Sequence, residues 1–378
     1  MKIVVLLKFN MSELKFINYF NTFLIGNIRI DYIRHKVIPA SALRNTAILF
    51  ANFLMVFYFS WQLFKKSKAT DTPMVPSQIT FEYISRILSF VVQYVALVLV
   101  LLDSLVSRRK LLCLANLMLN YTIRNKDRDK MKPKRHLEIL LEMCIVIICL
   151  TVMNVYNIIA NLQLISMVII IMITLIVYTI WLYLLGNLFY PLFFAEFLSL
   201  EFAILRERLK TKPLEAVLAN ADLLISMKKN ISQVFGRRLF FLLIQLFMNI
   251  SIDAYTVVVV FLERGQDGFN IQEFVLRMNT LTINLVSLFG MTNSFERVQT
   301  EEQEFKNAVK SLQYTATEEQ SEDYLNFLDL INLKLMAESP KITACGLFTI
   351  NLQVFYNVFA AIVTYIMILF QFRDFEKS

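Results

Sequence analysis

The sequence predicts an all-α membrane protein whose chain crosses the bilayer seven times. Hydrophobic residues make up 57% of the 378 positions and charged residues only 18%, which lies far outside the usage of soluble domains. Apolar windows of about 20 residues, the length that spans a bilayer core, recur along the chain. These windows lack the alternation of barrel strands, and a helix satisfies its own backbone groups in lipid. Helices are therefore expected throughout.

The apolar windows define the predicted spans. They lie at 46–64, 79–102, 137–159, 164–186, 239–262, 274–292 and 351–372. The third and fourth windows count as two spans because no charged side chain occurs from Met143 to Ala195, too long a stretch for one crossing. A tight turn near 157–163 is expected between them.

The distribution of Lys and Arg predicts the orientation in the membrane. Two of the 38 basic residues lie inside span ends; of the others, thirty fall on the side that holds the N-terminus and six on the opposite side. Because basic loops stay in the cytosol, segment 1–45 is predicted to be cytosolic and segment 373–378 extracellular. A G-protein-coupled receptor has the opposite orientation.

Two long connections are predicted to form a cytosolic helical anchor region. Segment 196–238 extends the transmembrane region 46–292 into the cytosol, and segment 293–350 precedes the last span. Apolar residues in the first connection recur three to four apart until Pro213, as in an amphipathic helix: Leu198, Phe202, Leu205 and Leu209. In the second connection one amphipathic helix should end before Pro340, and another should run to about Ile350. Packing below the bilayer is favoured over lying flat on the membrane.

The sequence offers no sign of catalysis. It contains two histidines and no metalloprotease, hydrolase or Walker-type motif. We therefore predict no catalytic residue, no cofactor and no metal site. The net charge of +8 comes from loops between apolar runs, which indicates membrane orientation and membrane lipid as a partner, with no nucleic acid. A transporter would show internal repeats with broken helices in both halves of the chain, and the sequence shows none.

The stretch "TYIMILFQF" at 364–372 closes the last span. With Thr364, Tyr365, Gln371 and Phe372, and the preceding "GLFTINLQVF", the chain resembles the insect gustatory receptors. The resemblance implies a tetrameric ligand-gated cation channel whose last helix lines the pore and whose cytosolic helices form an anchor between subunits. Insect odorant receptors share this topology but not usually the complete signature, and they remain the alternative.

Polar residues in the last span share one helix face. Asn357, Thr364 and Gln371 recur at steps of seven, and Ala361 and Ile368 lie on nearby turns. Such a stripe suits hydrogen bonding between helices or a pore. Because it lies in the closing helix with the family signature, we predict that these five residues line the pore.

A second set of polar residues is predicted to contact a stimulus. Asp253 is an acid deep in the fifth predicted span, where an ionisable group usually marks a functional site. Arg277 at the outer end of the sixth span is a possible partner, and a water-filled cavity is the alternative. The predicted set is Asn154, Asn157, Asn249, Asp253, Thr256, Thr280 and Asn284.

Together the resemblance and the topology predict a gustatory receptor in the plasma membrane of chemosensory neurons. It would be opened by a small-molecule tastant or metabolite and pass cations with little discrimination. The resemblance also implies assembly as a homotetramer, or as a heterotetramer with other gustatory receptors.

Overall fold

A computed structural model describes residues 28–31, 36–39, 50, 81–125, 167–262, 271–314, 322–337 and 339–377, and this part of the chain is mostly helical. The helices are α3 (Phe81–Val106), α4 (Arg108–Arg124), α6 (Met167–Arg208), α7 (Leu214–Leu262), α8 (Ile271–Tyr314), α9 (Glu322–Ala337) and α10 (Leu352–Lys377). Two short antiparallel pairs join β1 (Ile28–Asp31) to β2 (Lys36–Pro39) and β3 (Thr343–Ala344) to β4 (Phe348–Thr349). The predicted span 137–159 lies outside the described residues, as does 46–64 apart from Phe50.

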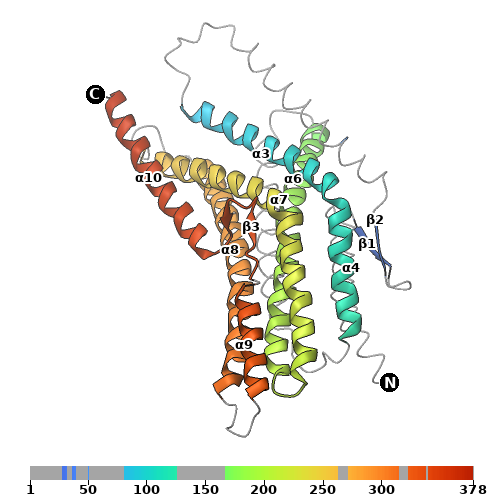
Figure 1. The fold of residues 1–378 in the computed structure, drawn as a ribbon. Helices are drawn as coiled ribbons and strands as arrows, with labels where there is room; N and C mark the ends of the chain where they lie inside the picture. The colour runs from blue at the N-terminus through green and yellow to red at the C-terminus, as the bar shows by residue number, and fades with distance from the viewer. Residues whose placement is uncertain are drawn as a thin grey trace.

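Three long helices form the frame of the molecule (Figure 1). Helices α6, α7 and α8 contain 42, 49 and 44 residues, so each is at least about 60 Å long and about twice the thickness of a bilayer core. The predicted continuation of helix beyond residue 186 is confirmed by α6. Pro213 lies between α6 and α7, where its missing N–H prevents one continuous helix.

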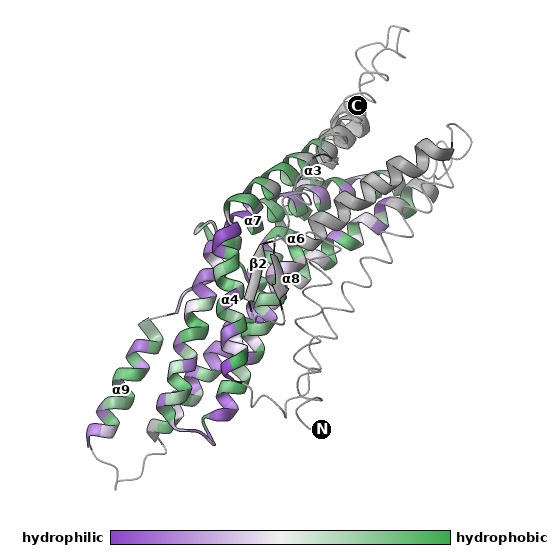
Figure 2. Ribbon diagram, turned by 90° about the vertical axis from the view of Figure 1, so that its right-hand side faces the viewer, coloured by the Kyte–Doolittle hydropathy of each residue, from purple (hydrophilic) through white to green (hydrophobic). Residues whose placement is uncertain are grey.

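The lower parts of these helices pack as a bundle with α4 and α9 (Figure 1). Phe202 of α6 and Phe305 of α8 are fully buried, with ring centroids 6.2 Å apart. The predicted amphipathic helix before Pro340 is confirmed by α9, which contacts α8 and buries Leu328, Ile331 and Leu335. Figure 2 shows hydrophilic and hydrophobic residues alternating around this bundle, whereas hydrophobic residues predominate on α3 and the upper part of α7.

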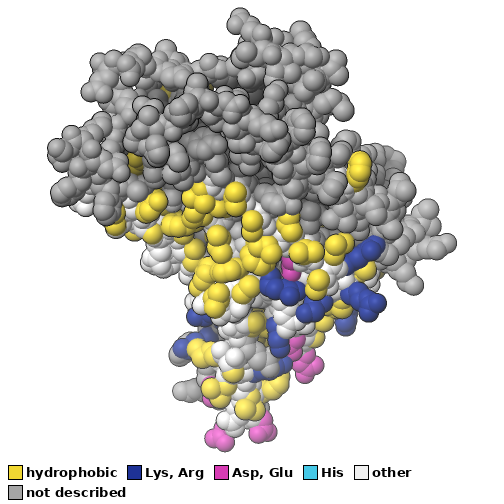
Figure 3. All heavy atoms as spheres, turned by 90° about the horizontal axis from the view of Figure 1, so that it is seen from above, with side chains coloured by type: hydrophobic (Ala, Val, Ile, Leu, Met, Phe, Trp, Pro, Cys, Tyr) yellow, Lys and Arg dark blue, Asp and Glu magenta, His cyan; other side chains and the backbone are white. Residues whose placement is uncertain are grey.

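The described helices differ in how well they fit a membrane span. Within the described residues, Leu214–Val259 includes a stretch long and apolar enough to cross a membrane. The pair Val91–Val106 and Arg108–Arg124 meets the same criterion together, bent by 65°, and Leu352–Ile368 is a shorter apolar helix. Figure 3 shows hydrophobic side chains gathered in a broad patch with Lys and Arg along one margin. The count of seven spans stays a prediction.

The expected helix from 342 to about 350 is wrong, because β3 and β4 form a hairpin there. Cys345 and Gly346 have φ values of 54° and 77°, a left-handed conformation that a right-handed helix excludes, and Leu347 N–H closes the turn on Ala344 C=O at 3.0 Å. The pair β1–β2 also departs from the all-α prediction. Helix α10 continues to Lys377, beyond the predicted end at 372.

Candidate functional site

Asp253 of α7 forms the centre of a buried polar cluster with two residues of α8, here called the outer cluster. Arg277 Nη1 donates to Asp253 Oδ1 at 3.2 Å, and Asn284 Nδ2 donates to Asp253 Oδ2 at 3.4 Å. The side chains of Asp253 and Arg277 are 8% and 13% exposed. The structure therefore decides between the two interpretations left open by the sequence in favour of an ion pair. The long arginine side chain bridges the difference in helix level.

The other predicted stimulus residues lie in different relations to this cluster. Asn249 is buried on α7 one turn from Asp253. The hydroxyls of Thr256 and Thr280 donate to carbonyls of their own helices, Ile252 O at 2.8 Å and Arg277 O at 3.0 Å. Asn154 and Asn157 lie outside the described residues. The structure thus places five of the seven residues on α7 and α8, at or near one helix–helix contact.

Two further polar residues lie on the same helices, farther than the outer cluster from the connection between α7 and α8. Gln245 of α7 and Ser287 of α8 are each 4% exposed. Within the described part of the chain, Gln245 Oε1 and Ser287 Oγ have no hydrogen-bond partner. Buried polar atoms are normally paired, so these two atoms mark places where water or a ligand group would be favourable.

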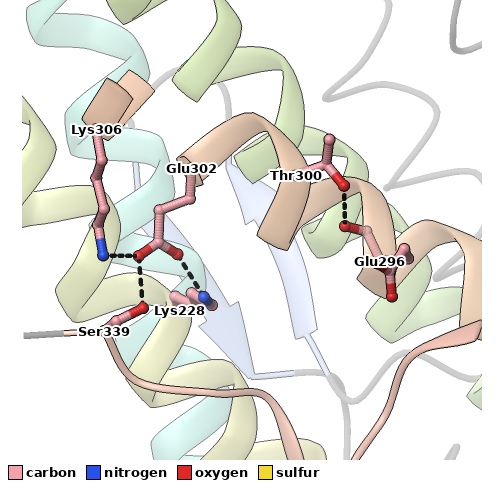
Figure 4. A network of polar contacts seen from close by, with 6 residues as sticks. All are labelled: Lys228, Glu296, Thr300, Glu302, Lys306 and Ser339. Atoms are coloured by element: carbon pink, nitrogen blue, oxygen red, sulfur yellow. Dashed lines mark hydrogen bonds and ion pairs between the residues drawn. The ribbon is translucent and has the colours of Figure 1, made fainter. Parts of the chain in front are cut away.

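Farther along the same two helices, away from the connection between them, lies a second group of charges, here called the inner network (Figure 4). Glu302 of α8 binds Lys228 of α7 through Oε2, and its Oε1 accepts from Lys306 Nζ at 2.7 Å. Ser339 Oγ donates to the same Oε1 at 3.1 Å. Glu302 and Lys228 are each 2% exposed, so this carboxylate joins α7, α8 and the chain after α9 in the interior.

Burial and charge act in opposite directions on Glu302. Burial by itself raises the pKa of this carboxyl, but the Lys228 and Lys306 ammonium groups and their hydrogen bonds hold it below its ordinary value. Burial lowers the pKa of Lys228, and Glu302 offsets part of that effect. None of the residues of this network was predicted as functional from the sequence. Glu302 and Lys306 are spaced i, i+4, which signals a helix pair, but Lys228 lies 74 residues away from Glu302.

A third polar group joins α3 to α6 and α7. Asp103 of α3 lies 3.0 Å from Arg237 Nε and 3.5 Å from Arg238 Nε. Arg238 Nη1 also donates to Asn187 Oδ1 of α6 at 3.2 Å. These contacts fix α3 to the frame. Among the described residues, no three His, Cys, Asp or Glu side chains are arranged to hold a metal ion.

Helix α10 is attached to the rest of the chain along one stripe. Ile362 is buried, and Phe355, Val358 and Ile366 pack against the core, while α10 contacts α7 and α8. The predicted pore residues are all exposed: Asn357, Ala361, Thr364, Ile368 and Gln371. At 100° per residue their stripe lies about 145° around the helix from the packed stripe. Tyr365 of the signature is 44% exposed; the side chain of Phe372 is outside the described set.

Polar contacts on α10 extend the predicted stripe by one residue. Gln353 is exposed one turn before Asn357 and donates through Nε2 to Asn357 Oδ1 at 3.0 Å. Thr364 Oγ1 donates to Ala360 O at 2.9 Å, so its proton is used within the helix. Gln353 was not among the predicted pore residues, although its position four residues before Asn357 puts it on the same helix face.

The family model described as "7tm Chemosensory receptor" matches residues 14–376, so the chain belongs to this family. Members are multi-pass membrane chemosensory receptors rather than enzymes. Gustatory and pheromone receptor 32a of Drosophila melanogaster is 24% identical over 132 residues, 35% of this chain and 27% of that relative. The match therefore spans about a quarter of that relative's length.

Solved structures share the fold at low sequence identity. The olfactory receptor OR5 of Machilis hrabei superposes with a TM-score of 0.58 at 11% identity, over 78% of this chain and 82% of that one. The structure of OR5 in complex with eugenol gives a TM-score of 0.55 at 12% identity, over 77% and 82%. The fold is thus that of an insect chemosensory receptor.

Proposed function

We propose that this chain is a gustatory receptor that acts as a ligand-gated, non-selective cation channel. The proposal includes seven spans, a cytosolic N-terminus and an extracellular C-terminus. The thirty-to-six distribution of basic residues supports that orientation. The local similarity to a gustatory and pheromone receptor favours taste over smell. The OR5 fold keeps an odorant-type channel as the second candidate.

One observation carries the channel proposal. Helix α10 packs on the rest of the chain by one stripe and leaves the stripe with Asn357, Thr364 and Gln371 exposed. A polar stripe facing lipid is costly, whereas four copies of α10 around an axis would place it against water. In that arrangement Gln371 amides replace part of a cation's hydration, and Ile368 side chains form an apolar constriction that closes by dewetting.

Helix α9 supports assembly through the cytosolic anchor. Leu330, Leu333 and Met336 are 66%, 64% and 62% exposed on the side of α9 that faces away from α8. Large apolar side chains on a charged cytosolic bundle suit a subunit interface. We propose a homotetramer, or a heterotetramer with other gustatory receptors, in the plasma membrane of chemosensory neurons.

The stimulus is proposed to bind near the outer cluster between α7 and α8. The unpartnered Gln245 Oε1 and Ser287 Oγ would offer an acceptor and a donor to a small polar molecule. OR5 has been solved with eugenol, a small phenol, which supports a small-molecule stimulus for this chain as well. Asp253 is paired with Arg277, so the site presents little net charge and suits a neutral tastant.

The channel proposal is tested by recording currents from cells that express only this chain. Gln371→Ala should change unitary conductance or relative permeability, and Ile368→Ala should raise the resting current by weakening the constriction. Val363→Ala is the matched control, because Val363 is 46% exposed but lies about 100° or more around α10 from Thr364 and Ile368. If both pore variants behave like Val363→Ala at equal surface expression, this stripe does not line a pore.

A further inference from the structure

The segment 339–351, here called the connector, joins the cytosolic helix α9 to α10 and is fixed at both ends by carboxylates of α8. At its start, Ser339 Oγ donates to Glu302 Oε1 at 3.1 Å. Just after its end, the backbone N–H of Leu352 donates to Glu296 Oε2 at 3.3 Å. Figure 4 shows Glu302 and Glu296 on the same helix. One helix therefore determines where the connector begins and where α10 starts.

The middle of the connector is fixed to α7. The backbone N–H of Thr343 donates to Ser232 Oγ at 3.1 Å, and the two hydroxyl oxygens are 3.1 Å apart. A Cβ atom at Gly236 would lie 3.0 Å from Thr343 O and 3.3 Å from Cys345 N, so the two backbones approach closely only because residue 236 is glycine. The connector is thus packed on α7 without space between them.

Burial gives the connector little freedom to move alone. Ile342, Ala344 and Ile350 are fully buried, and Ile350 N–H donates to Ile342 O at 3.0 Å across the hairpin. Close-packed interiors transmit displacement because neighbours cannot move without a clash. A shift of α7 against α8 therefore has to move the connector.

The start of α10 has two hydrogen-bond acceptors of different origin. Asn351 Oδ1 accepts from Val354 N–H at 3.3 Å, a cap from the residue before the helix. Glu296 Oε2 accepts from Leu352 N–H and belongs to α8. A carboxylate is also favoured here because the first N–H groups of a helix carry partial positive charge. The first cap stabilises α10 wherever it lies, whereas the second ties its position to α8.

We propose that Glu296 is a positioning residue that couples the outer cluster to α10. This inference rests on the proposed channel function. On α7 and α8 the outer cluster lies toward the connection between the two helices. The connector contacts the same helices farther along, at Ser232 of α7 and near Glu296 of α8. A change at the outer cluster that displaces α8 moves the Glu296 carboxylate, and the first turn of α10 follows it. Coupling therefore needs no contact between stimulus and pore helix.

A double-mutant cycle separates coupling from a merely structural cap. The purified chain is recorded in planar bilayers without stimulus, and the spontaneous open probability is measured for Asn284→Ala, Glu296→Ala and the double variant. Asn284→Ala perturbs the outer cluster by removing one hydrogen bond. If Glu296 carries the coupling, the effect of Asn284→Ala on the open probability should be at least about ten-fold smaller in the Glu296→Ala background. That loss is on the scale of one hydrogen bond to a charged group. Unitary conductance should not change.

Glu304→Ala provides the matched control. Glu304 lies on α8 two turns beyond Glu296, its side chain is 49% exposed, and it pairs with Arg206 of α6. The Glu304→Ala variant removes the same charge from the same helix at a residue without contact to the connector. The effect of Asn284→Ala on the open probability should therefore persist in the Glu304→Ala background. Glu296→Gln keeps an acceptor oxygen and should restore part of the coupling.

Amide hydrogen exchange directly tests the hydrogen bond between Leu352 N–H and Glu296 Oε2. Exchange of the amides in Leu352–Phe355 should accelerate about ten-fold in Glu296→Ala and stay unchanged in Glu304→Ala, because only the first variant removes an acceptor there. Additive effects in the cycle, or unchanged exchange, would overturn the inference and leave the channel function intact. If the wild-type chain shows no openings either at rest or with a panel of sugars, bitter alkaloids and metabolites, the channel function is overturned and, with it, the inference.

Discussion

The helix pair α7–α8 holds two buried polar groups, the inner network and the outer cluster, and the two groups differ in whether unpaired polar atoms lie beside them. In the inner network, both oxygens of Glu302 have partners, which come from α7, α8 and the connector. In the outer cluster, Asp253 is paired with Arg277 and Asn284, but Gln245 Oε1 and Ser287 Oγ nearby on the same helices have no hydrogen-bond partner among the described residues.

This difference predicts that the inner network is rigid and that the region beside the outer cluster adapts to an added partner. A fully satisfied buried network is rigid, because any displacement breaks a strong interaction in a low dielectric. A group with unpaired atoms gains free energy from an added partner. We therefore expect the two helices to be held firmly where they contact the connector and to accept a ligand where they contact each other beside the outer cluster. That arrangement suits a mechanism in which a displacement beside the outer cluster is transmitted along α7 and α8 to the connector.

The largest expected effect comes from breaking the inner network. Glu302→Ala leaves Lys228, which is 2% exposed, without its carboxylate, and we expect a loss of about 3–5 kcal/mol in the free energy of unfolding. Thermal unfolding of the purified protein in detergent measures it. Glu304→Ala, with a side chain 49% exposed, should change stability by no more than about 0.5 kcal/mol. Equal unfolding temperatures for the two variants would show that the network is not stabilising.

A smaller loss is expected at the outer cluster. Asp253→Asn removes the carboxylate that pairs with Arg277, but this long side chain is 13% exposed near an end of its helix and can turn toward water, so the cost should be about 1–2 kcal/mol. Asp253→Asn combined with Arg277→Gln should recover part of it. Surface expression and thermal unfolding check both variants. A double variant less stable than Asp253→Asn would mean that Asp253 and Arg277 do not act as a pair.

The pH dependence of stability should report on the ionised Glu302 of the inner network. Because the folded-state pKa of Glu302 is lowered, its contribution is fully present above the ordinary carboxyl pKa of about 4.3 and is lost as pH falls through the lower folded value. The difference in unfolding temperature between wild type and Glu302→Gln should therefore stay constant from about pH 8 to pH 5 and shrink below about pH 4. A difference that grows on acidification would contradict this direction.

The smallest effect on stability is expected from Ser287→Ala. The Ser287 hydroxyl is buried and has no partner in the described part of the chain, so its removal breaks no hydrogen bond and should leave stability within about 0.5 kcal/mol. The same variant should shift the stimulus concentration for half-activation, measured by dose–response currents. Asn284→Ala removes a bond to Asp253 and serves as the comparison, since it should lower stability as well. A large destabilisation by Ser287→Ala would show that its hydroxyl is paired.

Much of α10 followed from the sequence alone. Steps of seven between Asn357, Thr364 and Gln371 put these residues on one face of any helix, and helix geometry requires nothing more. Which side of α10 packs on α7 and α8 depends on Phe355, Val358 and Ile362 fitting against the core, and apolar residues surround the whole helix. Only the tertiary structure could show that the polar stripe lies away from that contact.

The Asp253–Arg277 pair shows the limit of counting along helices. Counting rise from the outer ends separates the two Cα levels by roughly 9 Å, which left an ion pair and a cavity equally possible. The relative shift and tilt of α7 and α8, together with the reach of the arginine side chain, bring the charges to 3.2 Å. Helix packing decides such shifts, and the spacing of residues within one helix does not encode them.

By itself the sequence determined the class of protein, the long helices and the break at Pro213, because composition, apolar periodicity and proline chemistry act locally. The tertiary structure alone decided that 342–350 is a hairpin and that Glu302 meets Lys228. The hairpin segment has few local strand or helix signals, and its close approach to Gly236 and its buried Ile342, Ala344 and Ile350 select its conformation. Lys228 and Glu302 are 74 residues apart, and only the packing of α7 on α8 brings their charges together.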